Sequence, residues 1–497
     1  MVRAIVFSDE ITLWWEKQWE LSDGVIYRVT LNGDIVGETV LTHFSLCNLD
    51  EKTAYRVKVE RIEDGSVKEC LASLDLSTPE AKRRIDVSSA PYFAKGDGAT
   101  LNTEAIQRAI DDCGENDCVY FPKGIFLSGA LNLHSDMEIY LDKDATLQGT
   151  ARVEDYLPKR KSRFEGIEMM CYSSLLNMGE LDHSSGPNCR NVIIRGRGSI
   201  LGGGTEHCNA VIEYERELLK EYLNENDDYI KTCENDSTIP GRARPRLVNI
   251  SNAENVILAN TTFGFGASWN IHFVYSQNIV TYGCKILSQG VWNGDGWDPD
   301  SSEDCVIFDT EFRTYDNSIA IKSGKNPEGN IIARPCSNIR IFDCRGGNCM
   351  ALGSEMSGGI SDIYIWDCDF SAPPSGIGLK VTKKRGGYIK RVRIRNSRFV
   401  NIRARCVSFN DDGEAAKTTP QVEDILFENI TLTGDTRKND GKPVELIQIL
   451  GVDGEENYFR NITLNRVLVP AQKNNSQAQI NIKNVKDLTL KNITFFE

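Results

Sequence analysis

The stretch that decides the fold reads Asp304-Cys305-Val306-Ile307-Phe308-Asp309, and it recurs as Asn338-Ile339-Arg340-Ile341-Phe342-Asp343 and as Asp362-Ile363-Tyr364-Ile365-Trp366-Asp367. Each copy begins with Asn or Asp, continues with mostly apolar side chains and ends with Asp. Neighbouring copies lie about one solenoid coil apart, within the spacing of roughly 20 to 50 residues that marks repeat architectures. Related copies begin at Asn191, Asn255, Asn278, Asp424 and Asp487.

These short strands favour a stacked solenoid over other β folds. A single strand cannot bury its apolar side alone, whereas coils stacked on one another bury a continuous column. Asn and Asp tolerate left-handed backbone at the turns and bond along the stack. A large β-sandwich or propeller needs hairpin signals between the runs, and those are mostly absent. Residues 87–497 are therefore predicted to form a right-handed parallel β-helix, and the chain is mainly β.

The first 86 residues have a different pattern, that of short antiparallel strands. Alternating runs occur at 11–15, 25–29 and 55–59, and Asn32-Gly33 supplies a hairpin turn. Tyr55 follows a turn, as in the tyrosine corner of fibronectin type III domains, where the hydroxyl bonds back to the preceding backbone. We expect residues 1–86 to form a fibronectin type III-like β-sandwich with a spacer, docking or cleft-flanking role.

Composition limits the partners of the chain. Its 497 residues carry a net charge of −14 and contain no basic block, which argues against a nucleic-acid partner. No run of roughly 18 apolar residues predicts a membrane span, and the N-terminal stretch lacks the pattern of a signal peptide. The 15 cysteines are scattered and odd in number, which favours reduced thiols in the cytoplasm. No metal or cofactor is expected, and the oligomeric state stays open.

One segment interrupts the repeats. Residues 206–238 are highly charged and helical in pattern, and we expect an insertion or lid beside the cleft. Directly after it, Arg242, Arg244 and Arg246 have two interpretations, a site for a uronate carboxylate or a solvated loop.

Two acidic turns one coil apart carry the strongest chemical signal. The first reads Asn293-Gly294-Asp295-Gly296-Trp297-Asp298-Pro299-Asp300, and the second begins Asp316-Asn317-Ser318. Equivalent positions of successive coils stack about 4.8 Å apart, so the two turns predict a carboxylate cluster on one face. Hydrolysis of a glycoside needs one carboxyl as acid and one as base.

These motifs resemble glycoside hydrolase family 28, the polygalacturonases, over about residues 88–495. The resemblance rests on the two acidic turns and on the runs 96–100, 353–359 and 378–382. It implies an inverting hydrolase with Asp316 as general acid and Asp295 as base, acting on pectic oligosaccharides. The N-terminal module further resembles that of bacterial exo-acting members. Residues expected to bind the substrate are Asn293, Asn317, Glu355, Lys380 and Thr382.

Three departures from the family pattern affect the expected site. Asn317 replaces a second Asp that helps to activate water, and removing it relieves like-charge repulsion in the cluster. The family's catalytic His falls on a run, 345–348, that contains none. The Arg-x-Lys pair that holds a uronate falls on Lys380 and Thr382, unless Lys383 or Lys384 has slid into place. Lys380 lacks the bidentate fork of Arg.

Other candidate residues have structural readings as well. Glu355 either lines the cleft or closes a polar turn. His272 is expected to be a packed structural residue, and Trp269, Trp292 and Trp297 are more often core than sugar platforms.

Three functions remain open on the sequence. The first is exo-hydrolysis of oligogalacturonides. The second is hydrolysis of another pectic glycoside, such as a rhamnogalacturonan fragment, and the third is carbohydrate binding without catalysis. A β-elimination lyase is a distant fourth, because that chemistry usually needs acidic clusters that bind Ca²⁺.

Overall fold

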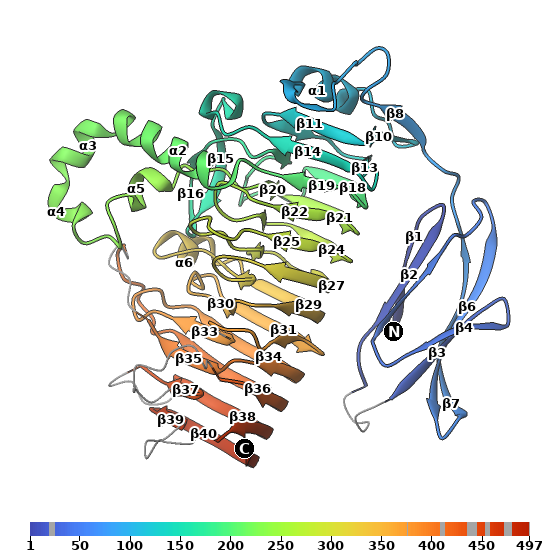
Figure 1. Cartoon of the computed structure of the whole chain (residues 1–497). Coiled ribbons are helices and arrows are strands. Elements are labelled where there is room, and N and C mark those ends of the chain that lie inside the picture. The colour runs from blue at the N-terminus through green and yellow to red at the C-terminus, as the bar shows by residue number, and fades with distance from the viewer. Residues whose placement is uncertain are drawn as a thin grey trace. The chain divides into compact units, whose positions relative to one another are not determined.

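The computed structural model describes residues 1–18, 25–374, 376–407, 413–434, 445–452, 458–471 and 480–496. The chain divides into two compact units, Met1–Arg84 and Ile85–Glu497, and Figure 1 labels their elements. The sequence placed this boundary between residues 86 and 87.

The N-terminal unit consists of two antiparallel sheets. One has the order β1-β2-β5 and the other β4-β3-β6-β7. Trp15 and Tyr27 meet edge to face in the core, with ring centroids 5.1 Å apart. The Tyr55 hydroxyl accepts a hydrogen bond from the Asp50 backbone N–H at 2.9 Å. The seven strands are β1 (Val2–Val6), β2 (Glu10–Trp15), β3 (Ile26–Leu31), β4 (Asp34–Thr39), β5 (His43–Cys47), β6 (Ala54–Glu63) and β7 (Ser66–Ser77).

The second unit is a parallel β-helix, as the sequence predicted. Figure 1 shows its coils stacked in chain order, from α1 at one end to β40 at the other. One face is an 11-stranded sheet whose paired strands are all parallel. Its strands are β12 (Leu131–Leu133), β17 (Leu176–Met178), β20 (Val248–Ser251), β23 (Ile271–Val274), β26 (Trp297–Asp300), β28 (Ile319–Ile321), β30 (Met350–Leu352), β33 (Ile377–Val381), β35 (Ile402–Cys406), β37 (Ile447–Leu450) and β39 (Ile480–Lys483).

The other faces belong to a 20-stranded sheet. Late in the chain single 12-residue strands run where two shorter strands stand earlier. Its strands are β8 (Arg83–Asp86), β9 (Asp97–Leu101), β10 (Asp117–Phe121), β11 (Gly124–Ser128), β13 (Met137–Leu141), β14 (Ala145–Gly149), β18 (Cys189–Gly196), β19 (Ser199–Leu201), β21 (Ala253–Ala259), β22 (Thr262–Gly264), β24 (Gln277–Tyr282), β25 (Lys285–Leu287), β27 (Val306–Arg313), β29 (Cys336–Gly346), β31 (Ile360–Trp366), β32 (Asp369–Phe370), β34 (Tyr388–Phe399), β36 (Gln421–Leu432), β38 (Phe459–Pro470) and β40 (Val485–Phe496).

A helix closes the first coil of the solenoid. Helix α1 (Thr103–Asp111) buries Ile106, Ala109 and Ile110 completely in the same hydrophobic core that the strands fill. That core runs without interruption from Ile85 to Val469. The end strands of the first coil are thereby covered by apolar helix rather than by water.

The predicted turn residues adopt left-handed backbone. Asn255 and Asn278 have φ of 56° and 53°, and their side chains bond along the stack. The Asn278 amide donates to Asn255 at 2.6 Å, and Asn255 donates to Asn191 at 3.1 Å. This is the conformation for which Asn is enriched among side-chain-bearing residues.

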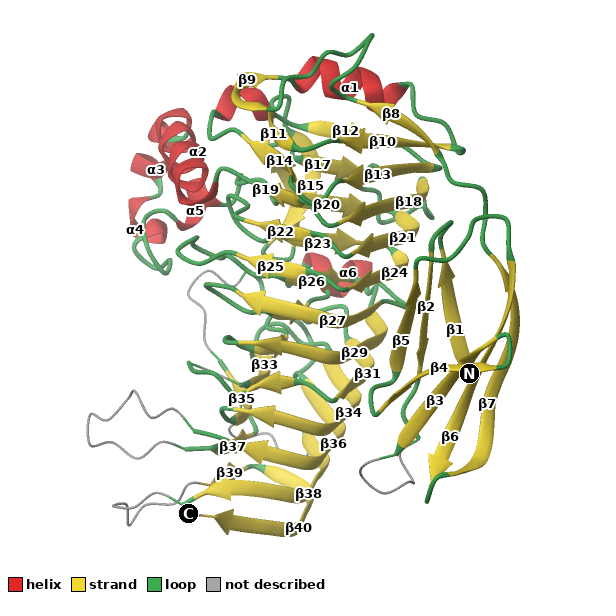
Figure 2. Cartoon of the chain, turned by 45° about the vertical axis from the view of Figure 1, so that its right-hand side comes forward, coloured by secondary structure: helices red, strands yellow, loops and turns green. Residues whose placement is uncertain are grey.

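Two excursions leave the coils. An antiparallel hairpin consists of β15 (Arg160–Phe164) and β16 (Ile167–Cys171). A helical segment follows, which Figures 1 and 2 show projecting from one side of the solenoid. It is longer than the predicted 206–238 and contains α2 (Gly204–Leu218), α3 (Lys220–Glu225), α4 (Asp227–Ile230) and α5 (Thr238–Gly241).

The remaining helices are short, namely the 3-10 turn η1 (Val153–Tyr156) and α6 (Glu328–Ile332). Among the described residues, no helix is long and apolar enough to cross a membrane.

Candidate active site

The candidate site lies on the outer face of the 11-stranded sheet, around β26 and β28. Along β26, Trp297 points into the hydrophobic core. Successive side chains of a strand alternate between faces, so Asp298 and Asp300 point outward. In the next coil Lys322 directly follows β28, and its backbone forms an isolated parallel β-bridge with the backbone of Asp300. Charged side chains of two neighbouring coils therefore meet on one surface.

The two acidic turns stack, but with an offset that the sequence did not predict. Trp297 pairs with Ile319, and the Gly296 N–H donates to the Asn317 carbonyl at 3.0 Å. Asp295 lies two residues before Trp297, and Asn317 lies two residues before Ile319. Asn317 is thus the residue in register with Asp295, and Asp316 precedes it by one position.

Asp295 is almost fully buried, with 2% of its surface exposed. Burial and then the nearby Asp316 charge raise the pKa of its carboxyl to about 7, against the opposing effects of Lys322, Asn317 and Lys380. Asp316 itself is partly exposed, and its Oδ1 accepts the Asn317 backbone N–H at 2.9 Å. A buried and a partly exposed carboxyl therefore lie close enough to influence each other.

Asn317 and Lys380 contact each other rather than standing apart. The Asn317 amide donates to Asp295 Oδ2 at 3.2 Å, and Lys380 Nζ donates to Asn317 Oδ1 at 3.1 Å. The structure thus brings together Asp295, Asp316, Asn317 and Lys380 of the predicted residues.

Lys322 was not among the predicted site residues, yet it lies at the centre of the cluster. Its Nζ lies 3.5 Å from Asp295 Oδ2, 3.7 Å from Glu355 Oε2 and 4.3 Å from the centre of the Trp269 ring. Burial lowers the pKa of Lys322, but the charges of Glu355, Asp298 and Asp295 outweigh that effect and raise it. Lys322 is a buried cation that offsets several carboxylates at once.

Two further buried carboxylates of β26 behave in opposite ways. Asp298 has no hydrogen-bond partner for either oxygen among the described residues, and burial raises its pKa well above the usual value. Burial also acts on Asp300, but Arg163 at 3.1 Å and His272 at 3.5 Å hold its pKa below the usual value. Asp300 is an ion-pair partner of the hairpin.

His272 has the structural character that the sequence suggested. It is fully buried, packs edge-on against Trp269, and burial lowers its pKa to about 4. Trp269 stacks on Phe164, with centroids 4.7 Å apart, and Trp297 lies in the core.

Glu355 and Thr382 lie at the far side of the cluster. Burial raises the pKa of Glu355, but Lys322 and Arg385 lower it to about 2, so Glu355 is an ionised partner of these cations. Thr382 is 2% exposed, and its hydroxyl has no partner among the described residues. Lys383 and Lys384 are exposed, whereas Arg385 is buried and donates to Ser354 Oγ at 2.7 Å.

Asn293 is held by an arginine for which neither predicted interpretation was right. Arg244 is fully buried and donates to Asn293 Oδ1 at 2.7 Å and to the Trp292 carbonyl at 2.8 Å. Arg246 is also buried and donates to Ser162 Oγ at 2.6 Å, and Arg242 pairs with Glu165 at 2.9 Å. These arginines join structural elements and form neither a solvated loop nor an open anion site.

The helical insertion packs beside the first acidic turn. Cys208 and Ile212 of α2 cluster with Ala267 and Trp292, and Thr205 Oγ1 donates to the Gly290 carbonyl at 3.1 Å. Trp292 also lies over Arg244 at 4.1 Å. The insertion therefore supports the loop that precedes Asp295.

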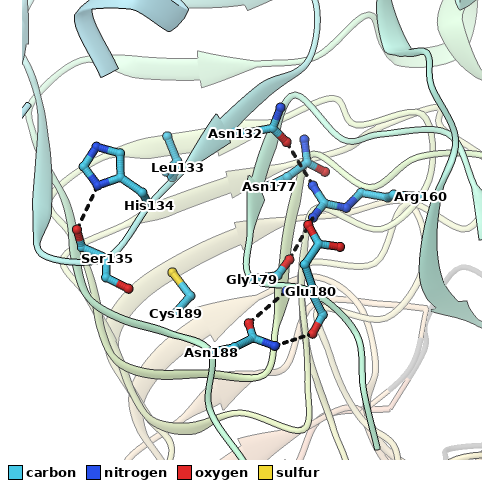
Figure 3. Close-up of a pocket in the computed structure, with 10 residues that line it drawn as sticks. All are labelled: Asn132, Leu133, His134, Ser135, Arg160, Asn177, Gly179, Glu180, Asn188 and Cys189. Atoms are coloured by element: carbon cyan, nitrogen blue, oxygen red, sulfur yellow. Dashed lines mark hydrogen bonds and ion pairs between the residues drawn. The ribbon is translucent and has the colours of Figure 1, made fainter. Parts of the chain in front are cut away.

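A separate pocket of about 410 Å³ lies beside β12 and β17, and none of the predicted site residues lines it (Figure 3). Arg160 there bonds Glu180 Oε1 at 2.7 Å and the Gly179 carbonyl at 2.8 Å. Asn188 bonds both backbone groups of Glu180. Most of these polar groups bond to one another, and the pocket holds no pair of carboxyls, so the acidic cluster is the stronger candidate site. The described residues contain no group of three His, Cys, Asp or Glu suited to a metal ion.

Sequence reasoning missed Lys322, Asp298, Asp300 and Arg163. The alternation along β26 gave a signal for both aspartates, because every second residue of a strand faces the same side. Arg163 gave none, since its hairpin lies outside the repeat and reaches the cluster only through the fold.

Comparisons with known proteins find one family and several relatives. The profile of Glycosyl hydrolases family 28 matches residues 121–487. An exo-poly-alpha-D-galacturonosidase of Dickeya chrysanthemi is 26% identical over 475 residues, covering 89% of this chain and 77% of the relative. A probable polygalacturonase of Vitis vinifera is 30% identical over 332 residues, or 63% of this chain and 60% of the relative. The structure of the Yersinia enterocolitica family 28 exopolygalacturonase superimposes with a TM-score of 0.80 at 22% identity, covering 99% of this chain and 95% of that one.

Proposed function

Because this chain belongs to Glycosyl hydrolases family 28 and is a glycoside hydrolase, we propose that it cleaves galacturonic acid from one end of pectic oligosaccharides, with inversion. The observation that carries the proposal is the pair Asp295 and Asp316 on the outer face of the sheet. The exo-acting Dickeya relative supports the choice of substrate.

Each carboxyl has one role in the proposed reaction. Asp316, partly exposed, donates its proton to the glycosidic oxygen as the bond to the anomeric carbon breaks. Asp295 removes a proton from water as that water attacks the anomeric carbon from the opposite side. One proton is given and one is taken, so Asp316 ends ionised and Asp295 protonated, and the product has the inverted configuration.

The β15–β16 hairpin supports exo action. Ser162 Oγ donates to Asn249 on β20 at 2.8 Å, Phe164 stacks on Trp269, and the Lys325 N–H donates to the Gly166 carbonyl at 2.9 Å. The hairpin thereby covers part of the outer face from β20 to the residues that follow β28. We propose that this cover blocks the path of the substrate on one side of the acidic pair, so that a chain end is accepted, whereas an endo-acting enzyme needs an open path on both sides.

Product analysis tests the proposal. Saturated and unsaturated oligogalacturonides are incubated with the enzyme. Products are followed by chromatography, and NMR reports the anomeric configuration of the newly released sugar. We expect one galacturonate unit per event, initially in the inverted form, and loss of roughly two to four orders of magnitude in Asp316→Asn. Full activity in Asp316→Asn would refute its role, and a ladder of mixed oligomers would refute exo action.

A second substrate class has its own structural motive. Lys380 is engaged by Asn317, and Thr382 is buried, so the family's two-residue hold on a uronate is altered. A rhamnogalacturonan fragment or another pectic glycoside is the alternative. Rhamnogalacturonan oligomers belong in the same panel, and cleavage there but not of oligogalacturonides favours this alternative. Binding without turnover of any glycoside favours a carbohydrate-binding role.

We further propose that the N-terminal unit is a fibronectin type III-like module. Its strands divide three and four between two sheets, and Tyr55 accepts a backbone hydrogen bond as in a tyrosine corner. Removal of residues 1–84 with unchanged kcat would limit it to a spacer or docking role.

A reducing compartment, the cytoplasm, is our proposal for where the enzyme works. All fifteen cysteines lie in the described part of the chain as free thiols, and twelve are buried. Reduced thiols of this number suit a reducing environment. Cell fractionation with activity and immunoblot readouts tests the location, and recovery outside the cell would overturn it.

A further inference from the structure

The Asn317 side chain is fixed at both ends by charged groups. Its Nδ2 donates to Asp295 Oδ2 at 3.2 Å, and its Oδ1 accepts from Lys380 Nζ at 3.1 Å. A lysine ammonium only donates and an ionised carboxylate only accepts. Turning the amide over would therefore place donor against donor and acceptor against acceptor, so the two partners define one orientation.

The two oxygens of Asp295 are consequently not equivalent. Oδ2 receives the Asn317 amide and lies 3.5 Å from Lys322 Nζ. Among the described residues, no hydrogen bond reaches Oδ1. Oδ2 thus accepts one hydrogen bond and faces the Lys322 ammonium, while Oδ1 remains open to a water molecule.

We infer that Asn317 is a positioning residue whose amide, held by Lys380, fixes Oδ2 of Asp295 and leaves Oδ1 to take the proton from water. This inference rests on the proposed hydrolysis, in which Asp295 is the base. It gives Asn317 a different role from direct activation of water, because a primary amide cannot accept the proton of water at neutral pH. It also assigns Lys380 to the relay and not to a substrate uronate.

The charges around Asp295 explain why such a relay matters. Asp316 raises the pKa of Asp295 together with burial, and Lys322, Asn317 and Lys380 act in the opposite direction. The charge of Asp295 in turn contributes to the raised pKa of Asp298, after burial. Loss of the amide or of the Lys380 charge therefore makes the base harder to ionise, and the acidic limb of activity moves to higher pH.

Four variants test the relay: Asn317→Ala, Asn317→Asp, Lys380→Met and the double variant Asn317→Ala/Lys380→Met. The readout is the pH profile of kcat/KM. We expect each single variant to move the acidic limb upward by about 0.5 to 1 pH unit, or roughly three- to tenfold in kcat/KM below the limb. Asn317→Asp is expected to move it most, because it places a further carboxylate directly beside Asp295.

The double variant distinguishes a relay from two separate effects. If Lys380 acts in part through Asn317, the double variant shifts the limb by less than the sum of the two single variants. An unchanged limb in either single variant would overturn the inference. So would additive shifts, or a Lys380→Met variant that only raises KM for uronate-bearing substrates.

Asn132 offers a matched control on the same sheet. Its Oδ1 also accepts from a cation, Arg160 Nη1 at 3.1 Å, but it lies beside β17 and not beside the acidic turns. Asn132→Ala and Asn132→Asp should leave the pH profile unchanged, and a shifted profile there would count against the relay.

A readout without substrate separates this inference from the proposed function. The melting temperature of the native protein and of Asp295→Asn is measured against pH, and the midpoint of their difference reports ionisation of Asp295. Asn317→Ala should move that midpoint upward even if oligogalacturonides are not the substrate. A moved midpoint with no hydrolysis rejects the proposed function alone, and an unmoved midpoint rejects the relay.

Discussion

Asp295 and Asp300 differ by five positions but have opposite environments. Burial acts on both carboxyls, yet Asp300 has the guanidinium of Arg163 at 3.1 Å, whereas Asp295 has the like charge of Asp316 nearby. The pKa of Asp300 is held down and that of Asp295 is raised to about 7. Asp295 can therefore exchange a proton near neutral pH, whereas Asp300 stays ionised as the ion-pair partner of Arg163.

The raised pKa of Asp295 predicts the pH dependence of catalysis. Asp295 must be ionised to act as base, so kcat/KM should rise with pH until about pH 7 and fall roughly tenfold per unit below it. Initial rates on an oligogalacturonide from pH 4.5 to 9 test this. A plateau extending down to pH 5 would contradict it.

The same carboxyl predicts a pH-dependent cost in stability. A pKa raised from 3.8 to about 7 means that the folded protein holds this proton more tightly than the unfolded chain. Its stabilising contribution is present below about pH 4 and is lost as pH rises through about 7. Asp295→Asn should therefore have a higher melting temperature than the native protein. The corresponding difference in the free energy of unfolding should grow from pH 5 to pH 8 and be of the order of 2 kcal/mol at pH 8.

Asp300→Asn is the contrasting control for that measurement. Its pKa is lowered in the fold, so its contribution is present at neutral pH and is lost as the pH falls through the lowered value. Asp300→Asn should melt below the native protein at pH 7, and the deficit should shrink in acid. The same sign for both variants would mean that burial alone governs the site.

The sequence predicted the acid pair but not its surroundings. Asp295 and Asp316 stand in motif-bearing turns of consecutive coils, so stacking alone places them together. The bond between Asn317 and Lys380 depends on side chains of coils 63 positions apart in sequence, whose register no local pattern states. Arg163 reaches Asp300 from a hairpin outside the repeat. Contacts that cross coils at loops are therefore invisible until the coil lengths are known.

At the scale of the element, the turn residues explain why the fold was readable. Asp304, Asn338 and Asp362 begin the motif copies, and all have φ between 55° and 59°. Left-handed backbone costs most residues about 1 to 2 kcal/mol but is tolerated by Asn and Asp. A sequence that repeats Asn or Asp at this place, followed by apolar residues, therefore states both the turn and the strand. The hairpin and the helices carry no such repeat, and the extent of the helical segment was correspondingly underestimated.

Substitution at a ladder position measures that preference. Asn278 has a φ of 53° and donates to Asn255. Asn278→Val should cost roughly 1 to 3 kcal/mol, because a β-branched side chain is strained there and the ladder bond is lost. Asn278→Gly, which loses only the bond, should cost less. Denaturant titration compares the two, and equal losses would argue that strain is unimportant at this turn.

One buried ion pair joins the hairpin to β26. Arg163 and Asp300 are 1% and 0% exposed at their side chains. Arg163→Met leaves a buried carboxylate without its cation and should cost roughly 3 to 5 kcal/mol, concentrated in the hairpin. Limited proteolysis of the protein between residues 160 and 171 should accelerate. Product analysis should show cleavage at internal bonds of the oligosaccharide, because the side of the substrate path that the hairpin covers becomes open. The double variant Arg163→Met/Asp300→Asn should recover part of the loss, since no unpaired charge remains.

Among the described residues, each of the two units has its own large hydrophobic core. Residues from Val2 to Val59 form one, and residues from Ile85 to Val469 form the other. Because each unit has its own core, calorimetry should resolve two unfolding transitions, the smaller belonging to the N-terminal sandwich. Tyr55→Phe, which removes only the bond to Asp50, should lower that transition alone. One cooperative transition that moves as a whole would contradict the prediction.

The uneven length of the coils has a consequence for how such an enzyme changes over generations. Residues 176 and 248 are sheet neighbours, as are residues 248 and 271, although 72 positions separate the first two (248 − 176) and 23 the second (271 − 248). The sheet thus accommodates connections of very different length between neighbouring strands. Insertions, deletions or exchanges can therefore change a loop at one coil while the strands of the neighbouring coils keep their register. A change of loop length at one coil is therefore expected to alter the surroundings of the acidic pair without disturbing the register of the strands.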